Sequence, residues 1–383
     1  MRHALLLVLA TTLVALAGAQ AAYPDHGHGR GHGRGHHHGR GQAVVFVQTN
    51  EPSGNRIVVF DRRANGSLIR AGSYPTGGNG GVAAPGTESD RLASQGSLVY
   101  DARHSLLIAV NAGSDTVTTF KVRGDRLLHP RTVPSGGQFP ASVAVSGRLV
   151  YVLNSGGEGI VKGFWITGHK LRPIPGSARS LGLANSNPPD FLTSPGQVGF
   201  TPFGNKLIVT TKASGSHIDV FQVRRNGTLS ATPVMNSSAT PVPFAFTFTP
   251  QGRLASGEAA TSTLTTYQLN GDGTLSDPRS QSDGQTALCW IVRAQGFYYV
   301  SNTGSNDISS FRVGPDGQPM LLNAVAASTN MGPIDSTVSG RYLYVQTGSA
   351  GTVDGFRING DGSLSPIGSV TGLPVGQEGI ASS

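Results

Sequence analysis

The hydrophobic positions of this chain fall in short runs that are separated by turn residues, and residues 341–367 show the pattern clearly. Residues 342–345 are a compact apolar run of β-forming side chains, which residues 348–351 interrupt with glycine and serine. A second apolar run covers residues 353–358, and Asn-Gly-Asp-Gly at 359–362 is a hairpin signal before a third run begins. Three short strands joined by two turns are therefore predicted. A unit this small cannot bury its own apolar face, so copies must pack on one another.

Copies of this unit can be counted by the aromatic residue that closes the second of its three strands. These aromatic residues are Phe60, Phe120, Phe164, Phe221, Tyr267, Phe311 and Phe356. The steps between them are 60, 44, 57, 46, 44 and 45 residues, and the two long steps contain insertions at about 75–96 and 176–197. A further strand before these three completes a unit of four strands, and seven such units at this period predict an all-β fold, a seven-bladed β-propeller. Both insertions are expected on one face of the ring, where long loops commonly carry function.

The two ends of the repeat predict how the ring closes. The first unit begins at residues 44–47, which correspond to residues 342–345 and therefore to the second strand of a unit. Its missing first strand is predicted at the far end of the chain, because residues 374–382 resemble residues 139–146, which open the third unit. The C-terminal strand should then pair with the first blade and remove an exposed sheet edge.

The N-terminal segment has the pattern of a secretory signal peptide. Arg2 and His3 provide a positive start, residues 4–17 are an apolar run, and Ala-Gln-Ala at 19–21 is a small-x-small cleavage pattern. The apolar run is short for a membrane span, and no second apolar segment is long enough to form one. We therefore expect residues 1–21 to be removed and the protein to be secreted or periplasmic. An uncleaved anchor is the alternative.

Residues 22–42 are rich in histidine, glycine and arginine, a composition that cannot form a core and predicts a disordered linker. The propeller is expected to span residues 43–383. Histidines of the linker could capture a divalent metal transiently, but a flexible tract fixes no geometry, so neither a dedicated metal site nor a cofactor is predicted. A solvated linker and a weak attachment to anionic surfaces remain the two other interpretations.

Composition and charge exclude several classes of function. The formal net charge of +8 comes from scattered residues, without a basic run or interleaved aromatics, so nucleic-acid binding is not predicted. The chain has one cysteine, Cys289, and thus no intramolecular disulfide; a buried structural thiol is expected. A nucleophile elbow, a zinc-protease motif and a phosphate-binding loop are absent from the sequence. We expect a monomer whose partner is a small-molecule ligand or a protein.

The repeat also resembles a known family. Residues 339–349 and 297–311 are similar to the lactonase family of seven-bladed propellers, which includes bacterial 6-phosphogluconolactonase and fungal carboxymuconate cyclase. The resemblance spans residues 44–383. It implies a propeller that acts on a lactone or a related cyclic sugar-acid derivative, as a hydrolase or an isomerase.

This chain departs from the family pattern at four positions where that resemblance implies functional groups. The histidine that follows the proline opening the third unit is replaced by Ala141, and the family's Gly-Pro-Arg-His stretch reads Ser-Pro-Gly-Gln at 194–197. The family's Asn-Glu reads Thr-Lys at 211–212, and its Asn-Arg falls near 258–259, which is Glu-Ala here. A non-catalytic ligand- or protein-binding propeller is therefore the alternative hypothesis.

Polar residues at the ends of second strands predict a ring of side chains on the insertion-bearing face. Lys212 and Glu258 come from neighbouring blades and are the candidates for catalytic residues, as an acid–base or salt-bridge pair. The candidates for substrate binding are Asn111, Asn154, Asn302, Gln346, Gln138 and Gln197. For the asparagines a purely structural role is the competing interpretation, since asparagine tolerates the backbone conformations of turns.

Overall fold

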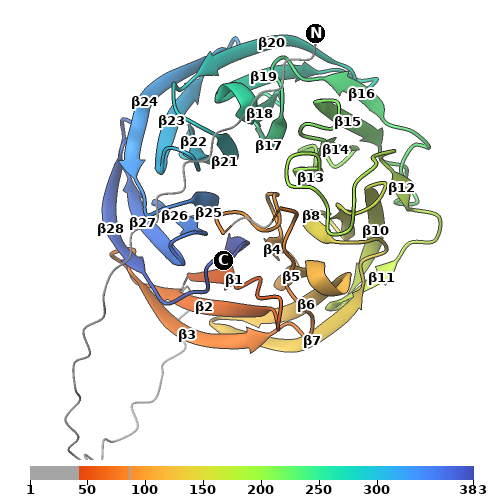
Figure 1. The fold of residues 1–383 in the computed structure, drawn as a ribbon, viewed down its shortest axis with the longest axis horizontal. Helices are drawn as coiled ribbons and strands as arrows, with labels where there is room; N and C mark the ends of the chain where they lie inside the picture. The colour runs from red at the N-terminus through yellow and green to blue at the C-terminus, as the bar shows by residue number, and fades with distance from the viewer. Residues whose placement is uncertain (1–42, 86–87) are drawn as a thin grey trace, which may run out of the picture. The chain divides into compact units, whose positions relative to one another are not determined.

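The apolar runs form the strands of seven antiparallel sheets, which are arranged as blades around a common axis (Figure 1). The computed structural model describes residues 43–85 and 88–383. Apart from two single-turn 3₁₀ helices, η1 (Ala112–Ser114) and η2 (Ala259–Thr261), the elements in these residues are β-strands. The predicted all-β, seven-bladed propeller is thus confirmed. The expected signal peptide and the histidine-rich linker lie outside the described residues.

Each blade has four strands that run in order from the axis to the rim. The first four blades consist of β29 (Ile380–Ser382), β1 (Val44–Gln48), β2 (Arg56–Arg62) and β3 (Leu68–Pro75); β4 (Leu98–Asp101), β5 (Leu106–Asn111), β6 (Thr116–Arg123) and β7 (Arg126–Pro134); β8 (Pro140–Ser146), β9 (Leu149–Asn154), β10 (Ile160–Thr167) and β11 (Lys170–Pro173), with β12 (Arg179–Ser180) also on β10; and β13 (Gln197–Phe200), β14 (Lys206–Thr210), β15 (His217–Gln222) and β16 (Val234–Ser237).

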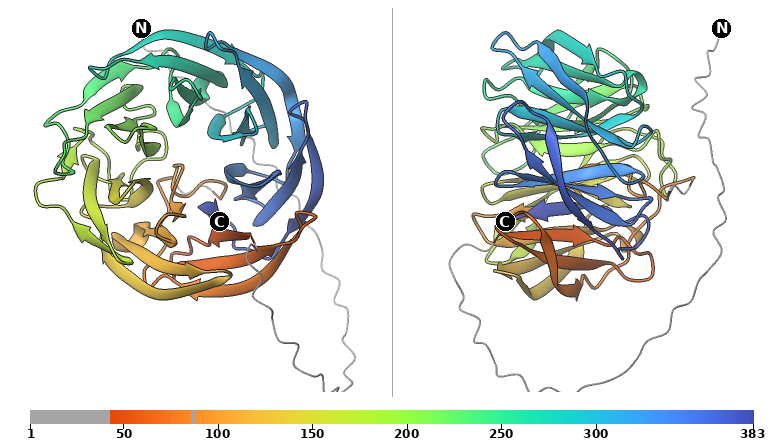
Figure 2. Two further views of the ribbon diagram at one scale, coloured as in Figure 1. Left: turned by 180° about the vertical axis from the view of Figure 1, so that it is seen from behind. Right: turned by 90° about the vertical axis from the view of Figure 1, so that its left-hand side faces the viewer.

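The last three blades repeat this arrangement without a change of topology. They consist of β17 (Pro243–Phe248), β18 (Leu254–Glu258), β19 (Thr263–Leu269) and β20 (Leu275–Ser282); β21 (Leu288–Ala294), β22 (Phe297–Asn302), β23 (Asp307–Val313) and β24 (Pro319–Ser328); and β25 (Pro333–Ser339), β26 (Tyr342–Thr347), β27 (Thr352–Ile358) and β28 (Leu364–Val370). Figure 2 shows the same ring from behind and from the side.

The second strand of every blade is buried along its whole length, which explains why the sequence shows continuous apolar runs there rather than alternation. Every residue of β5, β9 and β26 is buried, and the same holds for β1, β14, β18 and β22. Side chains on the two faces of such a strand contact the two neighbouring blades. A blade therefore reaches its full burial only when both neighbours are in place.

The hairpin turns of the repeat also lie at contacts between blades. Gly66 has a backbone φ of 89°, and a Cβ atom there would lie 2.5 Å from the ring of Tyr342 in the seventh blade. The hydroxyl group of Tyr344, also in the seventh blade, donates a hydrogen bond of 2.6 Å to the carbonyl oxygen of Gly66. The glycine is required both by the turn and by the close approach of the neighbouring blade.

The C-terminal strand closes the ring, as the sequence predicts. In β29, Ile380 pairs with Val47 and Ser382 pairs with Val45, so the last residues of the chain form the innermost strand of the first blade. The terminal residue extends this pairing, since the amide of Ser383 donates to the carbonyl oxygen of Val44 at 2.9 Å. In the described part of the chain, no helix is long and apolar enough to cross a membrane.

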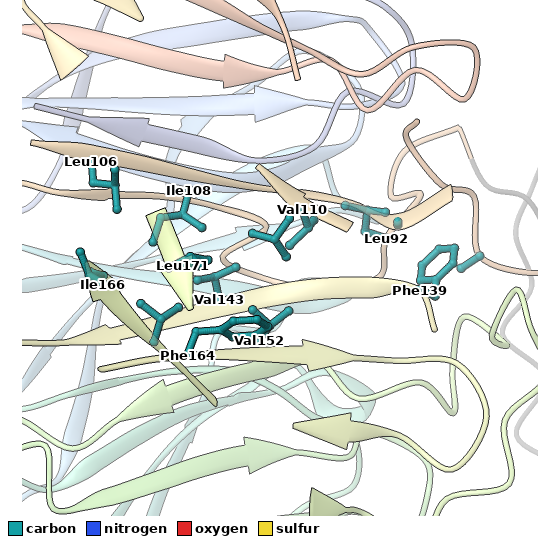
Figure 3. Close-up of a cluster of buried hydrophobic side chains, with 14 residues drawn as sticks. Leu92, Leu106, Ile108, Val110, Phe139, Val143, Val152, Phe164, Ile166 and Leu171 are labelled. Atoms are coloured by element: carbon teal, nitrogen blue, oxygen red, sulfur yellow. The ribbon is translucent and has the colours of Figure 1, made fainter. Parts of the chain in front are cut away.

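Two long connections between blades correspond to the predicted insertions. The first insertion, residues 76–97, joins β3 to β4, and the second insertion, residues 174–196, joins β11 to β13. They contact each other, because the amide of Phe191 donates to the carbonyl oxygen of Ala84 at 2.8 Å. Leu92 of the first insertion is fully buried and packs into a cluster formed mainly by the second and third blades (Figure 3). The first insertion therefore contributes Leu92 to the folded core.

Removal of the closing strand should destabilise the whole propeller. Deleting residues 380–383 removes the burial of Ile380 and Ala381 and exposes the edge of β1, so we expect the free energy of unfolding to fall by about 3 kcal/mol or more and aggregation to increase. Urea denaturation and light scattering measure the two effects. The control is Phe203→Ser, because Phe203 is 91% exposed. A truncated protein with an unchanged midpoint would show that the ring does not depend on this strand.

Candidate functional site

Strand pairing shows which of the predicted ring residues are equivalent. We call the aromatic residue by which each unit is counted, such as Phe120, the marker aromatic of its blade. Four ring residues lie four positions after the residue that pairs with this marker: Asn111, Asn154, Glu258 and Asn302. For Lys212 and Gln346 the predicted equivalence is wrong. Leu207 pairs with Phe221 and Leu343 with Phe356, so the equivalent residues are Thr211 and Thr347. Lys212 lies one residue further, at a backbone φ of 49°, and Gln346 lies one residue earlier.

Glu258 is fully buried and holds the connection that precedes its blade. Its carboxylate accepts hydrogen bonds from the amide of Thr240 at 3.0 Å, from the hydroxyl of Thr265 at 2.8 Å and from the hydroxyl of Tyr267. Burial raises the pKa of Glu258, and the hydrogen bonds from its neighbours act in the opposite direction. All of these donors are neutral groups of the protein, so the carboxylate stabilises the local structure of the fifth blade.

Lys212 is also buried, and its ammonium group is fully engaged. The Nζ atom donates to the carbonyl oxygens of Ala93 and Phe191, each at 2.7 Å, and to the hydroxyl oxygen of Ser194 at 3.0 Å. It also lies 5.0 Å from the ring centroid of Phe244. Burial lowers the pKa of Lys212 to about 8, and nearby carboxylates oppose that shift. An ammonium group has three protons, and each has an acceptor within the protein.

Two buried carboxyl groups lie beside this lysine and complete what we call the central cluster: Asp90, Lys212 and Glu378. Glu378 accepts from the amides of Leu92 at 2.6 Å and Ser94 at 3.4 Å. Burial raises the pKa of Glu378 well above its ordinary value, and the charge of Asp90 adds to that shift. A hydrogen bond between the two carboxyls raises the pKa of Glu378 further and lowers that of Asp90. Burial raises the pKa of Asp90 to about 6.

The first insertion fills the middle of the ring, where the innermost strands converge. Ser94 donates to the carbonyl oxygen of Ala141 in β8 at 2.8 Å, and its own carbonyl oxygen accepts from the indole of Trp290 in β21 at 3.1 Å. The side chain of Gln95 exchanges two hydrogen bonds with the backbone of Ile291, at 3.0 and 3.1 Å. Residues 93–96 thus connect the inner strands of several blades.

Asp335, on β25, completes these connections on the seventh blade. One oxygen of its carboxyl group accepts from the amide of Gly96 at 3.3 Å and the other from the amide of Ser336 at 2.9 Å. The side chain is buried, and burial raises its pKa to about 7, with the charge of Asp90 adding to the shift. A carboxyl group with so few donors is an unusual component of a closed core.

The two candidate catalytic residues belong to different networks. Within residues 43–85 and 88–383, no hydrogen bond or ion pair joins Lys212 to Glu258. Lys212 contacts the two insertions, whereas Glu258 contacts the strands and the preceding connection of its own blade. The predicted acid–base pair across neighbouring blades is not formed in this structure.

The asparagines of the ring tie second strands to third strands. Asn111 donates to the hydroxyls of Thr116 and Thr118 at 3.1 and 3.0 Å, and Asn302 donates to the carboxylate of Asp307 at 2.8 Å. Asn154 donates to the carbonyl oxygen of Ile160 at 3.1 Å. All three asparagines are buried, which supports the structural interpretation of their position at strand ends.

The three candidate glutamines have different surroundings. Gln346 accepts from the amide of Gly379 at 2.8 Å and so holds the C-terminal segment. Gln197 accepts from the amide of Phe246 at 2.6 Å, which connects β13 to β17 of the next blade. Gln138 is exposed on the loop before β8. Cys289 is buried, as the sequence predicts, and burial raises its pKa.

Sequence reasoning missed Asp90, Glu378 and Asp335, although two of them lie in segments that it had singled out. Asp90 belongs to the first insertion, and Glu378 belongs to the stretch predicted to close the ring. Asp90 lies outside the repeat, and Glu378 lies just before the short strand β29, so the repeated apolar runs mark neither position. In the described residues, no group of three or more histidine, cysteine, aspartate or glutamate side chains is arranged to hold a metal ion.

Comparison with known proteins supports the fold. No family model matches the sequence, and no curated protein matches it either. Among solved structures, the periplasmic gluconolactonase of Pseudomonas aeruginosa aligns with a TM-score of 0.69 at 17% identity, over 89% of this chain and 99% of that one. A protein from Lactobacillus plantarum aligns with a TM-score of 0.68 at 18% identity, over 89% and 99% of the two chains.

A 6-phosphogluconolactonase-like protein from Bacteroides uniformis gives a third alignment of this kind, with a TM-score of 0.69 at 17% identity over 89% of this chain and 99% of that one. At these identities the likeness establishes a shared fold. The resemblance to lactonase-like seven-bladed propellers, which the sequence indicates, is thereby confirmed at the level of the fold.

Replacing Lys212 should destabilise the protein strongly. Lys212→Met leaves three acceptors without a donor and two buried carboxyls without their cation, so we expect a loss of about 3–5 kcal/mol in the free energy of unfolding. Lys162→Met is the matched control, because Lys162 is half-buried and donates one hydrogen bond, to Ile174 at 3.1 Å. It should cost about 1 kcal/mol. Urea denaturation measures both variants, and equal losses would contradict a structural role for the central cluster.

Stability should fall as the pH rises through the range in which the buried carboxyls ionise. The pKa of Asp335 is raised to about 7, so the folded state retains a proton that the unfolded state releases above its ordinary value near 3.8. This carboxyl therefore stabilises the fold most below about pH 4, and about 4 kcal/mol of that contribution is lost by pH 7. Urea midpoints of Asp335→Asn between pH 4 and 8 should vary less than those of the wild type.

The control for this experiment is Asp316→Asn, because the side chain of Asp316 is 60% exposed in a turn. Its midpoints should follow the wild-type dependence on pH. If Asp335→Asn followed the same curve as this control, the buried carboxyl would not be a source of the pH dependence.

Proposed function

We propose that this chain is an exported, lactonase-like propeller that binds a ligand on its insertion-bearing face without catalysing its hydrolysis. The observation that carries this proposal is the engagement of Lys212. Its ammonium protons are donated to Ala93, Phe191 and Ser194, all of which belong to the two insertions. The residue that replaces a carboxylate of the family pattern is therefore used to fix these insertions over the centre of the ring.

Lactone hydrolysis needs a base that can take a proton from water and a donor that stabilises the developing oxyanion. A protonated Lys212 has no lone pair with which to accept a proton, and its protons already have acceptors. The carboxylate of Glu258 accepts from Thr240, Thr265 and Tyr267 and is buried. Neither residue presents a free reactive group to a substrate that arrives from solvent.

Export is supported by the sequence pattern of residues 1–21, with its positive start, short apolar run and small-x-small cleavage pattern. The similar fold of a periplasmic gluconolactonase is consistent with an extracytoplasmic location. We propose a secreted or periplasmic protein that acts as a monomer. Its partner is a small-molecule ligand rather than a nucleic acid, and the insertion-bearing face is the binding surface.

A second candidate function is turnover of a lactone, in which Lys212 and Glu258 would be catalytic residues. Two observations favour it: the fold is similar to that of a gluconolactonase, and the central cluster contains groups with strongly shifted pKa values, which are common at active sites. Catalysis would require residues 90–97 to leave the centre of the ring. Their hydrogen bonds to several inner strands oppose such a movement.

Assays of lactone hydrolysis distinguish the two candidates. We expect the purified mature protein to hydrolyse glucono-δ-lactone and 6-phosphogluconolactone no faster than buffer alone, measured by acid release in a pH-stat. Glu258→Gln retains the shape of the side chain and is the companion variant, with its folding checked by circular dichroism. Turnover at least tenfold above the uncatalysed rate, lost in a folded Glu258→Gln protein, would establish the second candidate in place of the first.

A further inference from the structure

One position of the repeat is polar in six of the seven blades and normally has hydrogen-bond partners within the protein. It lies two residues before the marker aromatic, in the third strand. In the seventh blade this residue is Asp354, whose carboxylate accepts from the amide and side chain of Asn330 at 2.7 and 2.8 Å. In the second blade it is Thr118, which donates to the carbonyl oxygen of Thr76 at 2.8 Å. Thr265 and Ser309 are likewise hydrogen bonded.

Asp219 occupies this position in the fourth blade and differs from the others. Its side chain is 2% exposed, and its Oδ1 atom has no hydrogen-bond partner among residues 43–85 and 88–383. The pairing residues on either side of it are Val209 in β14 and Met235 in β16, neither of which has a side chain that can donate a hydrogen bond. A buried carboxyl oxygen without a donor costs free energy, so its retention at this position needs an explanation.

A cavity of about 280 Å³ adjoins this carboxyl group at the contact between the third and fourth blades. Its walls come from the second insertion and from the ends of β14, β15 and β16, and the lining residues are Leu181, Gly182, Leu183, Ala184, Thr211, Ser214, His217, Asp219 and Met235. The volume is close to the lower end of the range for small-molecule pockets. The second insertion, an addition to the repeat, therefore creates a wall that other blades do not have.

The hydroxyl groups of the wall are already used by the protein. The hydroxyl of Thr211 donates to the carbonyl oxygen of Ser214 at 2.8 Å, and the hydroxyl of Ser214 donates to the carbonyl oxygen of Thr193 at 2.8 Å. Leu181, Leu183 and Met235 provide apolar surface. The lining of the cavity therefore combines one acidic group with largely aliphatic side chains.

We infer that this cavity is a binding site for a small primary ammonium or guanidinium compound, whose N–H groups donate to Asp219 and whose aliphatic part contacts the leucines. This inference rests on the proposed function, because it names the class of ligand. A charged donor is the strongest partner that a buried carboxylate can acquire. An anionic ligand would be repelled by the carboxylate, and a purely apolar ligand would leave the carboxylate oxygen without a hydrogen-bond donor.

The electrostatics of the site agree with this assignment. Burial raises the pKa of Asp219 to about 7, and no charged neighbour contributes to the shift. His217, from the same strand, is the other titratable residue in the lining, and the wall from the second insertion contributes none. The carboxylate is present at pH 8, where an alkylammonium ion is also charged, so binding is best measured there.

Calorimetric titration of the mature protein at pH 8 tests this site with two probes of the same shape, n-butylammonium and n-butanol. We expect n-butylammonium to bind at least tenfold more tightly than n-butanol. Asp219→Asn should weaken the binding of n-butylammonium at least tenfold. Asp354→Asn is the matched control, because it makes the same change at the equivalent position of the seventh blade, where the partners are internal, and it should leave binding unchanged.

Equal affinity for the two probes, or an unchanged affinity of Asp219→Asn for n-butylammonium, would overturn the inference. Either result would mean that the carboxyl group of Asp219 binds no ligand other than water. The comparison of probes on the wild type decides the question even if the variant does not fold. Failure of this inference is distinguishable from failure of the proposed function, since lactone turnover would overturn the latter and leave the ammonium binding in place.

Discussion

The structure depends on the burial of one strand per blade between two neighbouring blades. Because the second strands are covered on both faces, a blade at the end of an open array would expose one complete apolar face. Closure of the ring removes such an exposed end. The three-residue strand β29 closes the ring through its pairing with β1. This short strand therefore stabilises the protein by more than its own contacts provide, since closure of the ring completes the burial of the second strands in all blades.

The centre of the ring obeys a second constraint, which concerns charge. Asp90, Lys212 and Glu378 are buried together, and taking three ionisable groups out of water is favourable only if their charges and protons are matched. The hydrogen bond between the two carboxyls and the hydrogen bonds from the ammonium group to carbonyl oxygens meet that requirement. The same contacts hold both insertions, so the arrangement of the loops on this face follows from the neutralisation of the cluster.

The sequence predicts the part of the molecule that repeats, and its predictions are less accurate where the repeat is interrupted. The strands, the hairpins and the closure follow from apolar runs and turn residues that recur with a constant period. The alignment of strand ends is wrong for Lys212 and Gln346 by one residue each, because a turn can absorb one residue without any change in the apolar pattern. Asp335 accepts a hydrogen bond from Gly96, and the charge of Asp90 raises the pKa of Asp335. Both effects depend on the path of residues 93–96, which no local sequence pattern predicts.

Comparison of equivalent positions in the blades identifies a site that neither motifs nor family resemblance indicate. A polar residue two positions before the marker aromatic is structural where the protein itself provides donors, as for Asp354. The same residue type in the fourth blade lacks a donor for its Oδ1 atom within the described part of the chain, and it lines a cavity together with residues of an insertion. In a repeat, the structural requirement at a position can be seen in the other copies. A copy that keeps the costly group without the usual partners is therefore best explained by an interaction from outside the fold.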